Sequence, residues 1–368
     1  MPASLAQRTV FDDSHAAGLR LPLDDALAAL HPGASFPLIE DPRRLSRALV
    51  FGMMVLRPAS RAWNPDARGP MVDALPLVGD WCYDVAGIGG SWPVSAGNAV
   101  DAFRLALQYG TVDAVIAGAT TVCREGVGSD VAPGHIWQAW HAFSWPVLRP
   151  WRDSLEPAVA RTRRRWQELG VISERPHPAQ IVVTRSGLSP LPGRELLDAR
   201  IFRERHPDGS AIEARIVTSE AGAEAVRRQA GARGRRIDAM LLVASPPDDP
   251  CAIDVARVPA LLRERLDVRV AEHDGGAISL AAFVDAGAVS QLNLTLMRRR
   301  SVRDVVARST RIGAALRDEV LESWERRPRY FPPAGGALPS SWRPFFAVAE
   351  EGDDGEAVAV SFEVRTRS

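Results

Sequence analysis

The chain has 368 residues, of which 46% are hydrophobic and 24% charged, and its 45 basic side chains balance 45 acidic ones. This composition is typical of a globular protein, and zero net charge provides no field that favours nucleic acid or an anionic membrane. Three widely spaced cysteines argue against a disulfide framework, and no pair has metal-ligand spacing. The apolar run 48–56 is too short to span a membrane, and the N-terminal residues lack the apolar core of a signal peptide. We therefore expect a cytoplasmic protein without a metal site.

Histidines aside, every basic side chain is an arginine, because the sequence contains no lysine. Genomic base composition is the simplest explanation. The absence nevertheless excludes chemistry that needs a lysine amine, such as that of a P-loop, a pyridoxal Schiff base or a protein kinase.

Residues 1–70 are interpreted as a helical N-terminal extension, and residues 71–368 as the main domain. Asp41-Pro42 supplies an N-cap followed by proline at the first helical position. Apolar residues then recur at helical spacing from Leu45 to Leu56. We expect a helix here, as a packing extension or as a separate binding arm.

From about residue 78 the pattern alternates between short strands and helices. Helices are expected at 98–109, 223–229 and 258–266, and strands at 80–88, 113–118, 181–184, 214–218, 239–243 and 268–271. Such alternation indicates a mostly parallel sheet with helices on both faces. Near the end of the chain, 345–349 and 356–366 flank the turn 352–355, which predicts an antiparallel hairpin.

Two blocks of this pattern indicate a nucleotide site. In the later block, a strand runs into Asp274-Gly275-Gly276, then a short helix, Gly287 and a new strand. Glycines at such a junction let backbone N–H groups approach a phosphate, and the helix N-terminus adds its positive end. In the earlier block, the strand 113–118 runs into small residues and paired threonines, a surface suited to a flat cofactor.

Together and in this order, the blocks resemble the pyrimidine reductase family of riboflavin biosynthesis, whose fold is dihydrofolate-reductase-like. Family members commonly carry a strand ending in Gly-Ala-x-Thr-Val with Glu-Gly soon after. Later they carry an acidic-Gly-Gly turn, a helix, Ala-Gly-x-Val and a closing strand with Leu-x-Leu-Thr. The resemblance covers roughly residues 78–298, and the family also ends in an antiparallel hairpin. Asp274 stands where the family usually has Glu.

The resemblance implies an α/β fold and an NADPH-dependent reductase that transfers hydride to a C=N or C=O of a small, heterocyclic metabolite. Arg185 between two hydroxyls suits a ribose 2′-phosphate and favours NADPH over NADH, although an exposed turn arginine is an equal alternative. The residues expected at the cofactor are Gly118, Ala119, Thr120, Thr121, Val122, Thr184, Arg185, Ser186, Gly275, Gly276, Ala277 and Ile278.

Asp274 is the first candidate for the proton donor, followed by Asp84 and Glu125. A carboxyl beside an apolar cofactor has a raised pKa and can act as an acid, although each of these is otherwise a solvated or structural residue.

The first strand departs from the family, which usually presents Ser-Leu-Asp-Gly where this chain has Gly87-Ile88-Gly89-Gly90. Gly89 therefore replaces a carboxylate that faces substrate, which indicates recruitment to another biosynthetic route. The zinc-deaminase motif of bifunctional members is absent as well. The sequence does not fit a Rossmann dehydrogenase, because Trp92 occupies the third glycine position of the Gly-x-Gly-x-x-Gly motif. The alternative is a repurposed fold that binds a nucleotide or heterocycle without hydride transfer.

Two segments are longer than the family needs. The first, 127–160, holds four of the ten tryptophans and is either an apolar cluster under a loop or an aromatic wall over the substrate. We expect substrate contacts at Gly87, Gly89, Trp137 and Trp140, and expect His135 and His141 to be polar loop residues. The second, 300–338, contains an amphipathic helix at 302–326 that packs on the body or on a twin subunit, so we expect a homodimer.

Overall fold

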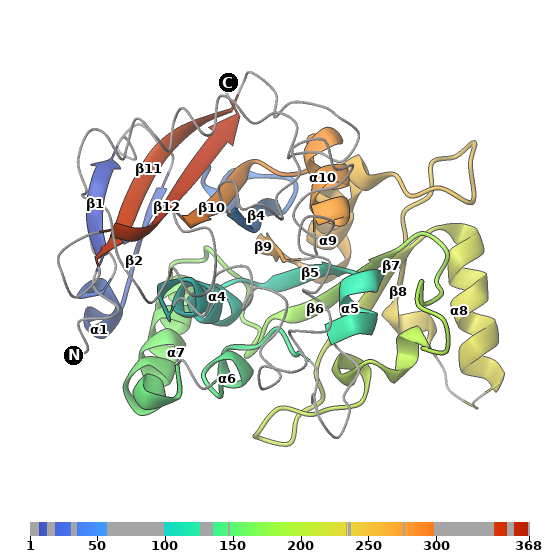
Figure 1. Cartoon of the computed structure of the whole chain (residues 1–368). Helices are drawn as coiled ribbons and strands as arrows, with labels where there is room; N and C mark the ends of the chain where they lie inside the picture. Colours follow the sequence, from blue (N-terminus) through green and yellow to red (C-terminus); the bar gives the residue numbers. More distant parts are fainter. Residues whose placement is uncertain are drawn as a thin grey trace, which may run out of the picture.

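A computed structural model describes residues 7–12, 19–30, 35–56, 99–125, 135–145, 148–232, 234, 237–274, 277–297, 342–351 and 357–366. Within these residues a ten-stranded sheet runs in the order β1-β11-β12-β10-β4-β9-β5-β6-β7-β8, and β2 and β3 form a separate pair (Figure 1). The strands are β1 (Gln7–Asp12), β2 (Leu19–Pro22), β3 (Ser35–Leu38), β4 (Leu49–Leu56), β5 (Ala114–Gly118), β6 (Ala179–Thr184), β7 (Ala214–Thr218), β8 (Leu241–Val243), β9 (Val270–His273), β10 (Gln291–Met297), β11 (Trp342–Glu351) and β12 (Ala357–Thr366).

Every neighbouring pair from β10 across to β8 is parallel. The pairs β1–β11, β11–β12 and β10–β12 are antiparallel. The expected fold class, a mostly parallel α/β sheet with an antiparallel C-terminal hairpin, is confirmed. The strand expected at 80–88 and the helix expected at 302–326 lie outside the described residues.

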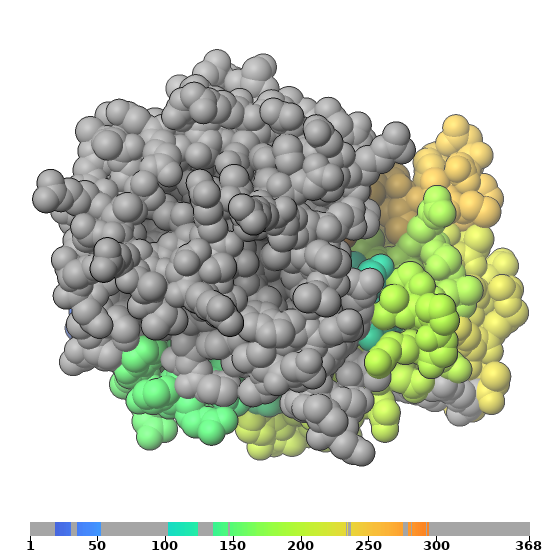
Figure 2. All heavy atoms as spheres, viewed as in Figure 1, coloured from blue at the N-terminus to red at the C-terminus, as the bar shows by residue number. Residues whose placement is uncertain are grey.

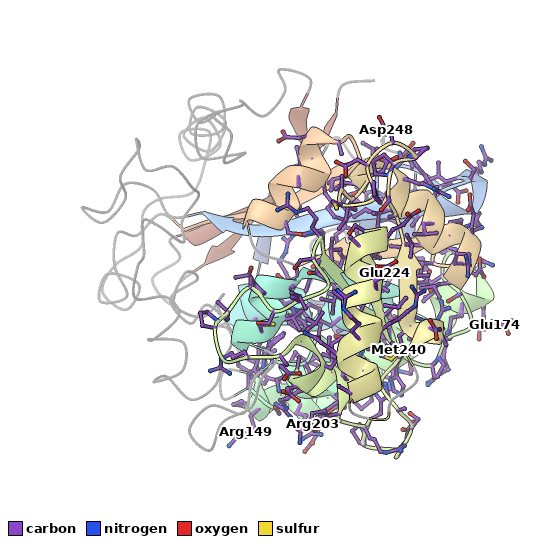
Figure 3. All side chains as sticks on the ribbon, turned by 90° about the vertical axis from the view of Figure 1, so that its right-hand side faces the viewer. Arg149, Glu174, Arg203, Glu224, Met240 and Asp248 are labelled. Carbon is purple, nitrogen blue, oxygen red and sulfur yellow. The ribbon has the colours of Figure 1, made fainter. Side chains whose placement is uncertain are left out.

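Helices cover both faces of the sheet. They are α1 (Asp25–Ala28), α4 (Ala99–Thr111), α5 (Ala119–Glu125), α6 (Ala139–Ala142), α7 (Arg152–Glu168), α8 (Glu220–Ala232), α9 (Val258–Leu266) and α10 (Ala277–Asp285). Adjacent strand residues point to opposite faces, so Val115 belongs to the same core cluster as Phe103 of α4, and Ile116 to the same cluster as Phe283 of α10. In Figure 1 the helices α4, α6 and α7 lie below the sheet, and α9 and α10 above it. Figure 3 views the β8 end, with α8 in front.

The helix expected over 42–56 is wrong. One 3-10 turn at Pro42–Arg44 is capped by the Asp41 carboxylate, and β4 then runs between β10 and β9. Leu49, Val50 and Phe51 are all fully buried, on alternating faces, because a central parallel strand is covered on both sides. Residues 49–56 are thus part of the sheet rather than of a helical extension, and the expected boundary at residue 70 lies outside the described residues.

Buried polar groups fix the amino ends of the strands. The Asp113 carboxylate accepts hydrogen bonds from the Ser173 amide and hydroxyl at 2.7 and 2.6 Å, and from the amides of Arg269 and Val270 at 2.8 and 3.2 Å. The Arg163 guanidinium donates to three backbone carbonyls, and burial lowers its pKa to about 10. The buried Asp113 and Arg163 side chains are both paired, so β5, β9 and α7 are held in one register.

Candidate functional site

The carboxyl ends of β9, β5 and β6, which are neighbours in the sheet, meet at one edge. β9 is followed by Asp274, β5 leads directly into α5 at Ala119, and β6 leads into the loop at Arg185. Open α/β sheets bind ligands at such an edge. In Figure 2 the teal surface of the β5–α5 region lies recessed between the lime-green surface that follows β6 and the gold surface that follows β8.

The residues Gly118–Val122 form a strand-to-helix junction rather than a flat strand surface. β5 ends at Gly118, and Ala119 opens α5. Ala119 and Val122 are buried in the core, whereas Thr120 is exposed and Thr121 is half-buried. The threonine pair is therefore the part of this segment that a ligand at the edge can reach. Glu125 is the last residue of α5, and the structure does not describe the position of its side chain.

The loop after β6 has a fixed backbone and an exposed arginine. The Ser219 hydroxyl donates to the Arg185 carbonyl at 2.7 Å and accepts from the Gly222 amide at 2.9 Å, at the start of α8. Gly187 has φ +69°, and a Cβ on Gly222 would lie 2.5 Å from the Arg185 carbonyl oxygen, so the loop and helix approach as only glycines allow. Thr184 is buried, while Arg185 and Ser186 are exposed.

Asp274 is the best-anchored acidic residue of the edge. Its Oδ2 accepts a hydrogen bond from the Tyr109 hydroxyl and one from Trp137 Nε1 at 3.0 Å. Its amide donates to the Ile116 carbonyl at 3.0 Å, which joins the end of β9 to β5. The carboxylate thus has a defined orientation directly before Gly275 and Gly276 in the sequence.

Trp137 does not form an open aromatic wall. It is buried in the main core, and its backbone amide and carbonyl are both bonded to the Gln180 side chain, at 3.1 and 2.8 Å. Trp140 donates to His206 Nδ1 at 3.2 Å, and His206 stacks on His177, which precedes β6. These contacts place Trp140 at the amino edge of the sheet, so the structure does not bring it to Asp274.

His135 and His141 are buried, so the interpretation of both as polar loop residues is wrong. The His135 ring packs against Trp137, His141, Trp145 and Tyr109, with centroid distances of 4.7 to 5.8 Å. Burial lowers the pKa of His135 well below its usual value and that of His141 to about 3, so both are neutral near pH 7. The Trp-rich segment belongs to the main core.

Sequence reasoning missed Tyr109, Glu272 and His273. Glu272 and His273 are fully buried on β9 and point to opposite faces. Among the described residues neither Glu272 carboxyl oxygen has a hydrogen-bond partner, and burial, with the nearby Asp274 charge, raises the pKa of Glu272 well above its usual value. His273 Nε2 lies 3.0 Å from Ser279 Oγ, and burial lowers the pKa of His273 to about 3. The signal in the sequence that could have identified them is the run Glu272-His273-Asp274, three ionisable residues at the end of an apolar strand.

Several expected site residues lie outside the described residues, namely Asp84, Gly87, Gly89, Gly275 and Gly276. Ala277 and Ile278 open α10, but their side chains are not described. In the described part of the chain, no group of three or more His, Cys, Asp or Glu side chains is arranged to hold a metal ion. No helix there is long and apolar enough to cross a membrane.

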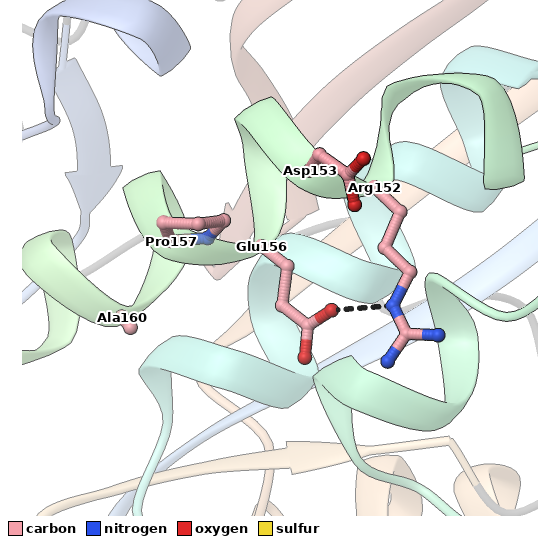
Figure 4. Close-up of a pocket in the computed structure, with 5 residues that line it drawn as sticks. All are labelled: Arg152, Asp153, Glu156, Pro157 and Ala160. Carbon is pink, nitrogen blue, oxygen red and sulfur yellow. Dashed lines mark hydrogen bonds and ion pairs between the residues drawn. The ribbon is translucent and has the colours of Figure 1, made fainter.

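A separate hollow lies on α7. It is lined by Arg152, Asp153, Glu156, Pro157 and Ala160, and the Arg152 guanidinium donates to the Glu156 carboxylate at 2.8 Å (Figure 4). An exposed pair four residues apart on a helix contributes only a few tenths of a kcal/mol, roughly 0.3–0.5. None of these residues belongs to the carboxyl edge, so the hollow is not the candidate site.

No protein-family model matches the chain, and no curated protein matches it. Among solved structures, the riboflavin biosynthesis reductase Rib7 of Saccharomyces cerevisiae is 11% identical over 88% of this chain and 91% of its own, with a TM-score of 0.39. A pyrimidine reductase-like protein of Corynebacterium diphtheriae is 11% identical over 87% and 92%, with a TM-score of 0.42. Acinetobacter baumannii RibD is 12% identical over 88% of this chain and 59% of its own, with a TM-score of 0.37. The solved structures similar to this chain thus include riboflavin-biosynthesis reductases, the family that its two sequence blocks resemble.

Proposed function

We propose that this chain is an NADPH-dependent reductase that transfers hydride to a C=N or C=O of a small, heterocyclic metabolite. The observation that carries the proposal is the adjacency of β9, β5 and β6. It brings Asp274, the exposed threonine of α5 and Arg185 to one edge of the sheet. An acid, hydroxyls and a cation thereby lie at the same edge, and we propose that they contact one ligand there.

The described residues fit a phosphorylated dinucleotide. Arg185 stands on a backbone fixed by Ser219, and within the described residues its guanidinium has no ion pair or hydrogen bond. An uncommitted guanidinium suits a 2′-phosphate. Thr120 and Thr121 would hold the cofactor at the start of α5, and Gly275 and Gly276, which precede α10 in the sequence, would hold the pyrophosphate. The cofactor, when bound, supplies the hydride.

Asp274 is the group we assign to the substrate side of the edge. Reduction of a C=N or C=O adds one hydride to carbon and one proton to nitrogen or oxygen, so the site needs an acidic group near the reacting atoms. Asp274 is anchored by Tyr109 and Trp137 and lies at the strand end. Gly87 and Gly89 stay proposed substrate contacts, Asp84 and Glu125 stay proposed secondary acids, and the homodimer stays a proposal.

The test is a thermal-shift titration with NADPH and NADH on the wild type, Arg185→Gln and Arg203→Gln. Arg203 is an exposed arginine in the loop before β7, at the other edge (Figure 3), which makes it the matched control. A ligand at about 100 times its Kd stabilises the fold by roughly 2.7 kcal/mol. We expect NADPH to raise Tm more than NADH, and expect only Arg185→Gln to remove this preference.

No shift with either cofactor would refute the proposal. Binding of NADPH without its oxidation by any reducible heterocycle would instead favour the alternative, a repurposed fold that binds a nucleotide without hydride transfer.

A further inference from the structure

Two carboxyl side chains, one in β9 and one directly after it, lie two residues apart on one face of the sheet. Val270 on this face packs in the same core as Phe103 of α4. Glu272 and Asp274 follow at the strand period, so their side chains share that face. In register, Glu272 is flanked by Phe51 of β4 and Val115 of β5, both buried and apolar. Glu272 therefore lies inside the sheet, and Asp274 at its edge.

The two carboxyls have opposite surroundings. Asp274 Oδ2 accepts hydrogen bonds from the Tyr109 hydroxyl and from Trp137 Nε1. Both oxygens of Glu272 are buried without a partner among the described residues. Donors to a carboxylate favour its ionised form, whereas burial without donors favours the neutral acid.

The two donors are themselves fixed. The Trp137 backbone is held by two hydrogen bonds with the Gln180 side chain, because its amide donates to Gln180 Oε1 and its carbonyl accepts from Gln180 Nε2. The His135 ring packs edge-on to Trp137 and to Tyr109, at centroid distances of 4.7 and 5.8 Å. The donors are thus pre-organised toward Asp274, and Tyr109 of α4 and Trp137 of the Trp-rich segment together form a clamp on this carboxylate.

The charged and titratable neighbours also favour a neutral Glu272 beside an ionised Asp274. Burial is the main cause that raises the pKa of Glu272, and the Asp274 charge adds to it. His273 lies on the opposite face, and burial keeps it neutral. Arg104, a further buried charged residue, belongs to the covering helix α4 and is not among the causes that act on Glu272.

We propose that Glu272 and Asp274 form an acid pair in which the negative charge resides on Asp274 and the proton on Glu272, with Tyr109 and Trp137 setting this division. Pairs of carboxyls in contrasting surroundings divide acid and base roles in this way. Before turnover Asp274 therefore meets the ligand as a hydrogen-bond acceptor, and the single proton that the pair holds is the one that reduction consumes, delivered through Asp274. Glu272 is a positioning residue that acts through Asp274. The catalytic part of this assignment rests on the proposed function.

Infrared difference spectra between the wild type and each carboxyl variant test the pair, and they need neither cofactor nor turnover. Near neutral pH the wild type should show a protonated carboxyl band that is lost in Glu272→Gln and retained in Asp274→Asn. A missing band, or a band lost in Asp274→Asn alone, would overturn the proposal. If the band behaves as expected but NADPH does not bind the wild type, only the proposed function fails.

Trp137→Phe and Tyr109→Phe test the clamp, with Trp145→Phe as the matched control. Trp145 is buried in the same segment, but its Nε1 has no partner among the described residues. Each clamp variant removes one donor to the Asp274 carboxylate. The pH at which a second proton binds the pair should therefore rise by about one unit, while Trp145→Phe leaves it unchanged. Equal shifts in Trp137→Phe and Trp145→Phe would refute the role of the clamp.

Discussion

Replacement of Glu272 by glutamine should change how the stability of the protein depends on pH. The carboxyl of Glu272 has an ordinary pKa of 4.5, and burial raises it well above that value in the folded protein. Between those two pKa values the folded protein holds a proton that the unfolded chain has released. The free energy of unfolding of the wild type must therefore fall as pH rises through this window, by about 1.4 kcal/mol per pH unit.

Glu272→Gln removes this titration and keeps a neutral side chain of similar shape. The buried amide lacks a partner as the acid does, which costs roughly 1–3 kcal/mol, but this cost is the same at every pH. The informative quantity is therefore the change of the stability difference with pH. From pH 5 to pH 7 the variant should gain up to about 2.8 kcal/mol relative to the wild type, two units at 1.4 kcal/mol each.

Urea unfolding at pH 5, 6 and 7 measures this difference. Glu224→Gln is the control, because Glu224 lies on the outer side of α8 with 68% of its side chain exposed (Figure 3). Its stability difference should not depend on pH. A difference between the wild type and Glu272→Gln that is constant across the three pH values would refute a protonated Glu272 in the folded protein.

Three further predictions concern neighbouring residues. Gly222→Ala should destabilise the protein by roughly 1–3 kcal/mol, because the added Cβ would lie 2.5 Å from the Arg185 carbonyl oxygen. It should also lower the preference for NADPH in thermal shifts. Gly231→Ala in the same helix, where a Cβ meets nothing within 4 Å, should have neither effect. His273→Gln should lessen the loss of stability at acid pH. A buried histidine with a pKa lowered to about 3 lowers the free energy of unfolding by about 1.4 kcal/mol per pH unit below 6.5. Urea unfolding of the variant and the wild type at pH 5 and 7 measures this difference. Asp274→Glu should lower Tm, because one extra methylene displaces the carboxylate from its donors. An unchanged Tm there would refute the clamp geometry.

Local patterns predicted the elements whose periodicity was unambiguous. The strands β5, β6 and β7 and the helix α9 were found within a few residues, because their apolar runs are bounded by turn residues. β4 was taken for a helix, because Leu49 and Leu56 fall at helical spacing within a run that is apolar throughout. A strand buried on both faces has no alternation to distinguish it from a buried helix.

The site was predictable only in part, for a different reason. The junctions at Gly118 and Asp274 follow from strand, turn and helix signals within about ten residues. The donors to Asp274 come from 165 and 137 residues away along the chain, on α4 and in the Trp-rich segment. A tyrosine in a helix and a tryptophan before one carry no local sign of such a contact, so only the fold brings them together.

The end of β9 also explains why function should lie there. Glu272 and His273 are buried in a central strand of a sheet covered on both faces, where apolar residues would be more stable, and Asp274 follows at the end of that strand. Each avoids or tolerates its charge differently: Glu272 by a raised pKa, His273 by a pKa lowered to about 3, and Asp274 by two hydrogen-bond donors at the strand end. Local rules broken at a stability cost are characteristic of functional sites, and here the broken rules converge on the residue that precedes Gly275-Gly276 in the sequence.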